Sequence, residues 1–122
     1  MDSKSVLIVD DEPDTLGLIE LTLQTAGYNV VTAANGDQAL GLLETESFDL
    51  LLLDIMMPGK TGFDIVRELQ AREQQIPRIV FLTAKNQAED REIGESLGAA
   101  AYLKKPTTRG DLLDAIELAI NS

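Results

Sequence analysis

The chain has 122 residues, with 21 acidic and 10 basic side chains, and it contains no histidine and no cysteine. This length predicts a single domain, residues 1–122, whose core is large enough to fold without disulfide bonds. The missing residue types exclude cysteine nucleophiles, histidine-containing dyads and thiolate or imidazole metal sites, and the net charge of −11 disfavours direct binding to nucleic acid or membranes.

The first half of the chain alternates apolar runs with helical patterns. Residues 6–9 form a short apolar run that predicts a strand buried on both faces. A helical period begins at Pro13, a residue suited to the first turn, and continues through Ala26 until Gly27 ends it. Residues 29–33, which include three consecutive β-branched side chains, predict a second strand.

The middle of the chain repeats this alternation. Asn35 is expected to cap the next helix, with Gln38 completing a capping box. Residues 48–54 contain four consecutive leucines and predict a central strand, because the run is short and bounded by polar residues, although leucine by itself favours helix. A helical stripe then runs from Phe63 to about Glu73.

The last third predicts two more strand–helix pairs. Residues 78–82 form the fourth strand, and residues 88–97 form a polar helix with few apolar positions. Residues 100–103 form a short fifth strand, after which Thr108 caps the final helix.

Five strand–helix units predict an α/β fold, a (βα)5 doubly wound five-stranded parallel sheet with helices on both faces in a three-layer sandwich. The amino-terminal residues 1–5 are too short and polar for a signal peptide, and no apolar run is long enough to span a membrane, so we expect a cytoplasmic protein.

Charged and hydroxyl side chains stand at the carboxyl ends of the predicted strands, where such sheets bind ligands. They are Asp10, Asp11, Asp54, Thr83 and Lys105. If the strand order is 2-1-3-4-5, the three carboxylates converge, and a hard divalent ion, Mg²⁺ or Mn²⁺, would relieve their repulsion. The alternative for any one of these acids is a helix cap.

The same edge suggests phosphoryl transfer. A carboxylate can attack phosphorus to form an acyl phosphate, and Asp54 is the best nucleophile candidate because it closes the most apolar strand. Lys105 would offer a point charge to one phosphoryl oxygen, and Thr83 would donate a hydrogen bond to another.

Four motifs in order make the sequence similar to a known family. These are the acidic pair at 10–11, Asp54 in a segment followed by Met57-Pro58 and Gly62, Thr83-Ala84, and Tyr102 with Lys104-Lys105-Pro106. Together they resemble the receiver domain of bacterial two-component response regulators, the CheY-like family, over residues 4–120, with its flavodoxin-like strand order 2-1-3-4-5.

The resemblance implies a role for each matching residue. Asp54 would accept phosphate from a partner kinase's phosphohistidine, and Mg²⁺ would be held by Asp54, by Asp10 or Asp11, and by the Met56 backbone carbonyl. The phosphoryl group would be contacted by Thr83 and by Lys105, which is the family lysine because it directly precedes Pro106.

Two further roles are implied for the last strand and the turn after it. Pro106 would follow a cis peptide bond, which would turn Lys105 inward. Tyr102 matches the switch position that turns inward when Thr83 shifts, although a half-buried strand residue without that role is the alternative.

Several positions depart from the family pattern. Thr107 stands where the family often has phenylalanine, so the start of the last helix is expected to pack differently. In the family, the residues two positions after the phosphorylated aspartate and after the threonine tune dephosphorylation, and the resemblance assigns these positions to Met56 and Lys85. Met56 offers an attacking water no good hydrogen bond, which predicts a long-lived phosphoryl state. The acids in 88–97 indicate either a basic output partner or a solvated face.

Rival functions find less support. Gly59-Lys60-Thr61 resembles the end of a P-loop, but the position that needs glycine is Asp54. Acids after the first strand would repel the phosphate of a flavin nucleotide, and no D-x-D motif supports an aspartyl phosphatase of the haloacid dehalogenase type. A receiver that serves only as a binding module would have no reason to keep three mutually repelling acids.

The sequence therefore predicts a phosphorylation-activated switch in a phosphorelay, which catalyses only its own phosphoryl transfer and hydrolysis. Its partners would be a histidine kinase or phosphotransfer protein, and an output protein or effector domain controlled through the surface formed by the helix at 88–97, the strand at 100–103 and the final helix. Pairing of two copies through that surface is left open, as is whether the domain works alone or within a longer regulator.

Overall fold

The computed structural model describes residues 3–84 and 88–121. Strands and helices alternate through these residues as predicted. In chain order they are β1 (Ser5–Val9), α1 (Pro13–Thr25), β2 (Asn29–Ala33), α2 (Gly36–Thr45), β3 (Leu50–Asp54), α3 (Gly62–Ala71), β4 (Arg78–Thr83), α4 (Ala88–Ser96), β5 (Ala101–Lys104) and α5 (Arg109–Ile120).

The five strands form one parallel sheet in the order β2-β1-β3-β4-β5. The order reverses at β1, whose Val9 lies opposite Leu53 of β3. The predicted fold class and strand order are confirmed. The reversal brings the carboxyl ends of β1 and β3 together, which is where an open α/β sheet binds ligands.

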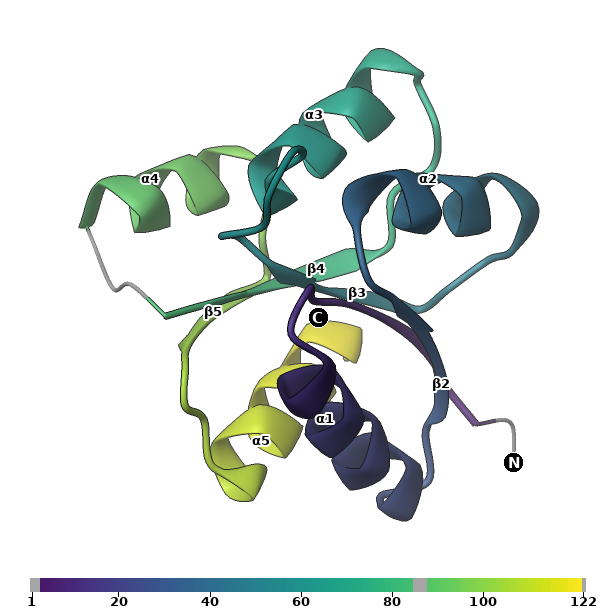
Figure 1. The fold of residues 1–122 in the computed structure, drawn as a ribbon, viewed down its shortest axis with the longest axis vertical. Coiled ribbons are helices and arrows are strands. Elements are labelled where there is room, and N and C mark those ends of the chain that lie inside the picture. Colours follow the sequence, from purple (N-terminus) through teal and green to yellow (C-terminus); the bar gives the residue numbers. More distant parts are fainter. Residues whose placement is uncertain (1–2, 85–87, 122) are drawn as a thin grey trace.

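The sheet is the middle of three layers: α2, α3 and α4 cover one face, and α1 and α5 cover the other (Figure 1). The leucine run of β3 shows why both faces are apolar. Leu51 and Leu53 pack in the core beneath α2 and α3, whereas Leu50 and Leu52 pack in the core beneath α1 and α5. Because successive strand residues point to opposite faces, a central strand needs an unbroken apolar run.

Local details differ from the sequence predictions at the ends of several elements, including the fifth strand, which runs over Ala101–Lys104 and not over 100–103. Asn35 caps α2 by accepting from the Gln38 backbone, but Gln38 accepts from the Ala34 amide, so the predicted reciprocal box with Asn35 is wrong by one residue. Ala26 lies beyond the end of α1 and is exposed. The third strand begins at Leu50 instead of Phe48, since its pairing with β1 starts at Leu50, opposite Val6.

None of the helices within residues 3–84 and 88–121 is long and apolar enough to cross a membrane.

Candidate functional site

Three carboxylates meet where β1 and β3 end. Asp10 directly follows β1, Asp11 comes next, and Asp54 is the last residue of β3. Each offers one oxygen, and these three oxygens lie within 4.8 Å of one another. Asp10 and Asp54 are only 1% and 3% exposed, respectively, so the cluster opens to solvent through Asp11. Three oxygen donors at this spacing fit a hard divalent cation such as Mg²⁺.

The ammonium of Lys105 reaches into the same cluster. Its Nζ lies 2.7 Å from Asp10 Oδ2 and 3.4 Å from Asp54 Oδ2. The lysine side chain is 12% exposed, so these ion pairs are far less screened than ion pairs on the surface. The structure therefore brings together the acids and the lysine that the sequence placed at three separate strand ends.

The protonation of Asp54 reflects this crowding. Burial raises its pKa to about 6, the charge and hydrogen bond of Lys105 oppose that rise, and the neighbouring charge of Asp10 adds to it. Burial also lowers the pKa of Lys105, but the Asp10 hydrogen bond and the charge of Asp54 outweigh that effect and raise it overall. The lysine thus stays cationic, while Asp54 is mostly ionised at neutral pH.

Thr83 and Met56 flank the acids on neighbouring segments. Thr83 is the last residue of β4 and is fully buried, and Asp54 lies opposite Leu82 of that strand. The Met56 backbone N–H donates to Asp54 Oδ1 over 3.3 Å, which fixes the loop after β3 against the carboxylate. Met56 is 49% exposed, and its thioether is too weak a hydrogen-bond acceptor to orient a water.

The turn after β5 delivers Lys105. The Lys105–Pro106 peptide bond is cis, and the Lys105 backbone N–H donates to the Thr83 carbonyl. Thr107 is half-buried, and Thr108 caps α5 by accepting from the Asp111 amide over 3.0 Å. The departure at Thr107 therefore leaves a normally capped helix behind it.

Tyr102 lies on β5, outside the acidic cluster. Its ring is half-buried, and the Arg91 guanidinium of α4 lies 5.3 Å from the ring centroid. The phenol oxygen is buried and has no hydrogen-bond partner within the described residues. The Tyr102 ring therefore lies against α4, and its role as a switch stays a prediction.

Two other sequence predictions concern α4 and the loop before it. The acids of α4 are exposed or half-buried: Glu89, Asp90, Glu92 and Glu95. The other residue predicted to tune dephosphorylation, Lys85, lies outside the described residues.

Sequence reasoning missed one participant, Glu12. Its Oε1 lies 3.7 Å from Lys105 Nζ, and its backbone N–H donates to Asp10 Oδ1 over 2.9 Å. The sequence signal for Glu12 was its position directly after the acidic pair, where the start of the first helix is also expected. Its carboxylate is 65% exposed, so we regard it as a screened contributor to the field around the lysine.

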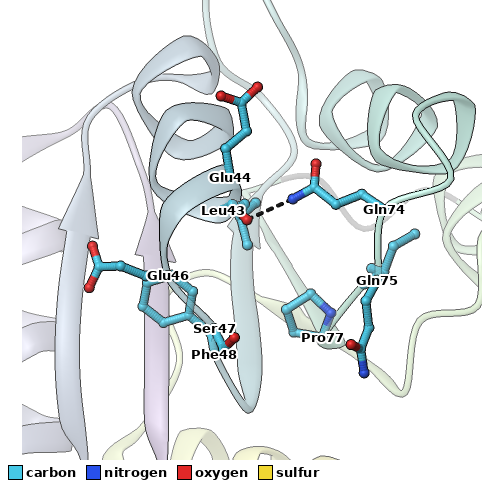
Figure 2. Close-up of a pocket in the computed structure, with 9 residues that line it drawn as sticks. Leu43, Glu44, Glu46, Ser47, Phe48, Gln74, Gln75 and Pro77 are labelled. Carbon is cyan, nitrogen blue, oxygen red and sulfur yellow. Dashed lines mark hydrogen bonds between the residues drawn. The ribbon is translucent and has the colours of Figure 1, made fainter.

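Two concave features have different relations to the cluster. A cavity of about 360 Å³ lies at the opposite, amino ends of β3 and β4, with Phe48 and Pro77 in its lining and the Gln74 side chain donating to the Leu43 carbonyl (Figure 2). A second groove, of about 350 Å³, lies beside Lys105 and includes Leu18 of α1. Of the two, the second is connected to the cluster, because its lining includes Lys105, whose ammonium pairs with Asp10 and Asp54.

Comparisons with known proteins agree with this geometry. The family described as response regulator receiver domain matches residues 6–117. The chain is 39% identical over 104 residues to the alkaline phosphatase synthesis transcriptional regulatory protein PhoP of Bacillus subtilis, covering 85% of this chain and 43% of that protein. It is 42% identical over 111 residues to the transcriptional regulatory protein CpxR of Escherichia coli K12, covering 91% and 47%. The chain thus spans about half the length of these relatives.

Solved structures give the same result. The chemotaxis protein CheY4 of Vibrio cholerae superimposes with a TM-score of 0.90 at 34% identity, covering 97% of this chain and 99% of that one. The receiver domain of a sensor histidine kinase from Pseudomonas aeruginosa, solved with a magnesium ion in its active site cleft, has a TM-score of 0.87 at 32% identity, with coverage of 99% and 100%.

Proposed function

The chain belongs to the response regulator receiver domain family, and from this premise we propose that Asp54 is the residue that accepts a phosphoryl group from a histidine kinase or phosphotransfer protein. A receiver domain of this family is a phosphorylation-activated signalling switch. The observation that carries the assignment is that Asp54 ends the central strand as a buried carboxylate, with the Lys105 ammonium 3.4 Å away and two further acids in the same cluster.

We propose Mg²⁺, or Mn²⁺ in its place, as the cofactor. Asp10, Asp11 and Asp54 would hold it, and the Met56 carbonyl is the fourth protein ligand proposed. When bound, the ion would neutralise negative charge on phosphoryl oxygens that approach the acids. The close spacing of the three carboxylate oxygens supports this assignment.

The transfer requires an ionised Asp54. One of its carboxylate oxygens forms the new bond to phosphorus while the bond from phosphorus to the donor imidazole nitrogen breaks, and that bond's electron pair stays on the imidazole. Lys105 is placed to shift from the free carboxylate toward the phosphoryl oxygens, and the Thr83 hydroxyl would donate to another of them. Hydrolysis later returns the carboxylate, so the only chemistry proposed is the protein's own loading and unloading.

The groove beside Lys105 is where we propose that the phosphohistidine donor docks. Leu18 lines this groove together with Pro106, and it is 67% exposed, so its apolar side chain is accessible to a docking partner. An apolar contact here would hold a donor imidazole next to the acids without a charged partner. This makes Leu18 a determinant of transfer from a protein donor.

Output would pass through the surface formed by α4, β5 and α5. Thr83 and Tyr102 are the residues proposed to couple phosphorylation to that surface, and the acids of α4 favour a basic output protein or effector domain over an acidic one. A second copy of the chain is the other partner that this surface could take. We propose that residues 1–122 form one receiver domain, acting in the cytoplasm.

The aspartyl phosphatase alternative is not supported, because Met56 stands where a second catalytic acid would be needed.

The assignment of Asp54 is tested by NMR with a beryllofluoride salt and MgCl2, which mimic the phosphorylated state. Amides around Asp54, Thr83 and Tyr102 should shift in the wild type and stay unchanged in Asp54→Asn. Equal shifts in both proteins would refute the assignment.

A further inference from the structure

The loop between β3 and α3, residues 55–61, carries an ion pair on its outer side. Lys60 Nζ lies 3.3 Å from Glu68 Oε2 of α3 and 3.7 Å from Asp37 Oδ1 of α2. The loop therefore touches both helices through one side chain. Its other end carries Met56, whose amide contacts Asp54.

Close packing against α2 restricts this lysine. A Cβ on Gly36, the first residue of α2, would lie only 2.7 Å from Lys60 Cβ, so the missing side chain is what lets the lysine stem cross the helix start. The stem is thus guided across α2 before its ammonium reaches the two carboxylates. On its inner side the loop is held by backbone hydrogen bonds, among them the Gly62 amide, which donates to the Ile55 carbonyl over 3.1 Å, and Lys60 adds an attachment on its outer side.

The carboxylate of Glu68 makes the pair more than an incidental surface contact. Its Oε2 is buried and has no hydrogen-bond partner within the described residues, so Lys60 is the cation that compensates it. Its other oxygen, Oε1, lies 3.3 Å from Arg72, which in turn lies 2.6 Å from Glu44 near the end of α2. One glutamate thus anchors two cations, but only Lys60 belongs to the loop.

We propose that Lys60 is a positioning residue, which clamps the β3–α3 loop to α2 and α3 and so holds the Met56 backbone where the Mg²⁺ site needs it. The inference rests on the proposed function for the metal, and it adds a residue that is not among the metal ligands proposed there. Removing the charge leaves Asp10, Asp11 and Asp54 in place and loosens the backbone that would complete the ligand set.

The test compares Lys60→Met with Arg72→Met. Both remove one cation from Glu68 and keep an apolar stem, but only the first releases the loop. MgCl2 affinity is measured by calorimetry, and hydrogen exchange of the Gly62 amide is measured by NMR in the metal-free protein. Lys60→Met should weaken Mg²⁺ binding about two- to fivefold and speed Gly62 exchange by a similar factor, the range expected for one ion pair. Arg72→Met should change neither by more than measurement error, and Lys60→Arg should restore both.

Equal effects of Lys60→Met and Arg72→Met on the two measurements would overturn the inference, since general destabilisation would then explain them. So would wild-type Gly62 exchange in Lys60→Met. A wild-type protein that binds no Mg²⁺ would instead contradict the proposed function, and the exchange measurement would still decide whether Lys60 holds the loop.

Discussion

Lys105 places its ammonium 2.7 Å from the buried carboxylate of Asp10. The same nitrogen is 3.4 Å from Asp54, so the proposed phosphoacceptor shares its counter-ion with a neighbour that lies closer. Without Mg²⁺, the lysine thus compensates part of the repulsion among the acids. Removing the lysine charge should therefore change the pKa of Asp54.

We expect Lys105→Met to raise the pKa of Asp54 above its wild-type value of about 6, because the lysine is the main influence that lowers it. The shift should be roughly one unit, the lower end of what an adjacent opposite charge contributes. A carbon-13 NMR titration of the Asp54 carboxyl in metal-free protein measures it. Lys104→Met, an exposed neighbour, is the control and should leave the midpoint in place; a lower or unchanged midpoint in Lys105→Met would contradict the electrostatic account.

Asp54 should also make the metal-free protein less stable as pH rises. Its folded-state pKa of about 6 exceeds the ordinary value of 3.8, so the folded chain binds the proton more tightly, and that stabilisation is present below pH 4 and lost as pH rises through 6. Asp54→Asn lacks this loss. Its advantage in free energy of unfolding should therefore grow between pH 4 and pH 7, by at most about 3 kcal/mol. Urea unfolding at several pH values measures it, and an advantage that is independent of pH would be the opposing result.

The fold was predictable because its signals are local: periodic apolar positions in the helices, and short apolar runs with polar boundaries in the strands. The leucines at 50–53 lack any period, yet their length and polar boundaries indicated a strand buried on both faces, which β3 is. The cluster at Asp10, Asp54 and Lys105 was predictable because parallel strands end at one edge, and the family motifs named the same residues.

What the sequence could not supply were contacts made by long side chains across the chain. Glu12 reaches Lys105 from a segment 93 positions away only because β1 and β5 end on the same side. Gly59-Lys60-Thr61, which resembled part of a P-loop, serves three separate purposes: Gly59 takes a φ of 79°, Lys60 pairs with two acids, and Thr61 caps α3. No spacing rule indicates such a division of roles.

A protein donor and a small-molecule donor should respond differently to the groove beside Lys105. Leu18→Ala should slow phosphoryl transfer from a phosphorylated histidine kinase about fivefold, since roughly 1 kcal/mol of apolar contact would be lost. Loading by acetyl phosphate should be unchanged. Leu118→Ala on α5 is the matched control, because Leu118 is 68% exposed but lies outside the groove lining. Equal slowing with both donors, or by both variants, would place the donor surface elsewhere.

The lifetime of the phosphoryl group should depend on Met56. Its exposed thioether offers an attacking water no strong hydrogen bond, so Met56→Asn should speed autodephosphorylation about fivefold, the value of one such bond. Met56→Leu keeps the apolar character and should behave as the wild type. Decay of the phosphorylated protein, followed by phosphate-affinity electrophoresis, measures the rate. An Asn variant as slow as the wild type would show that this side chain does not limit hydrolysis.

The most direct test of the account is the intact mass of the protein after incubation with acetyl phosphate and MgCl2. The wild type should gain the mass of one phosphoryl group, lose it on incubation with hydroxylamine as an acyl phosphate does, and gain none when Mg²⁺ is chelated. Asp54→Asn should gain no mass under any of these conditions. A phosphoryl group on Asp54→Asn in the same yield as on the wild type, or a wild type that stays unmodified with Mg²⁺ present, would contradict the assignment of Asp54 as the phosphoacceptor.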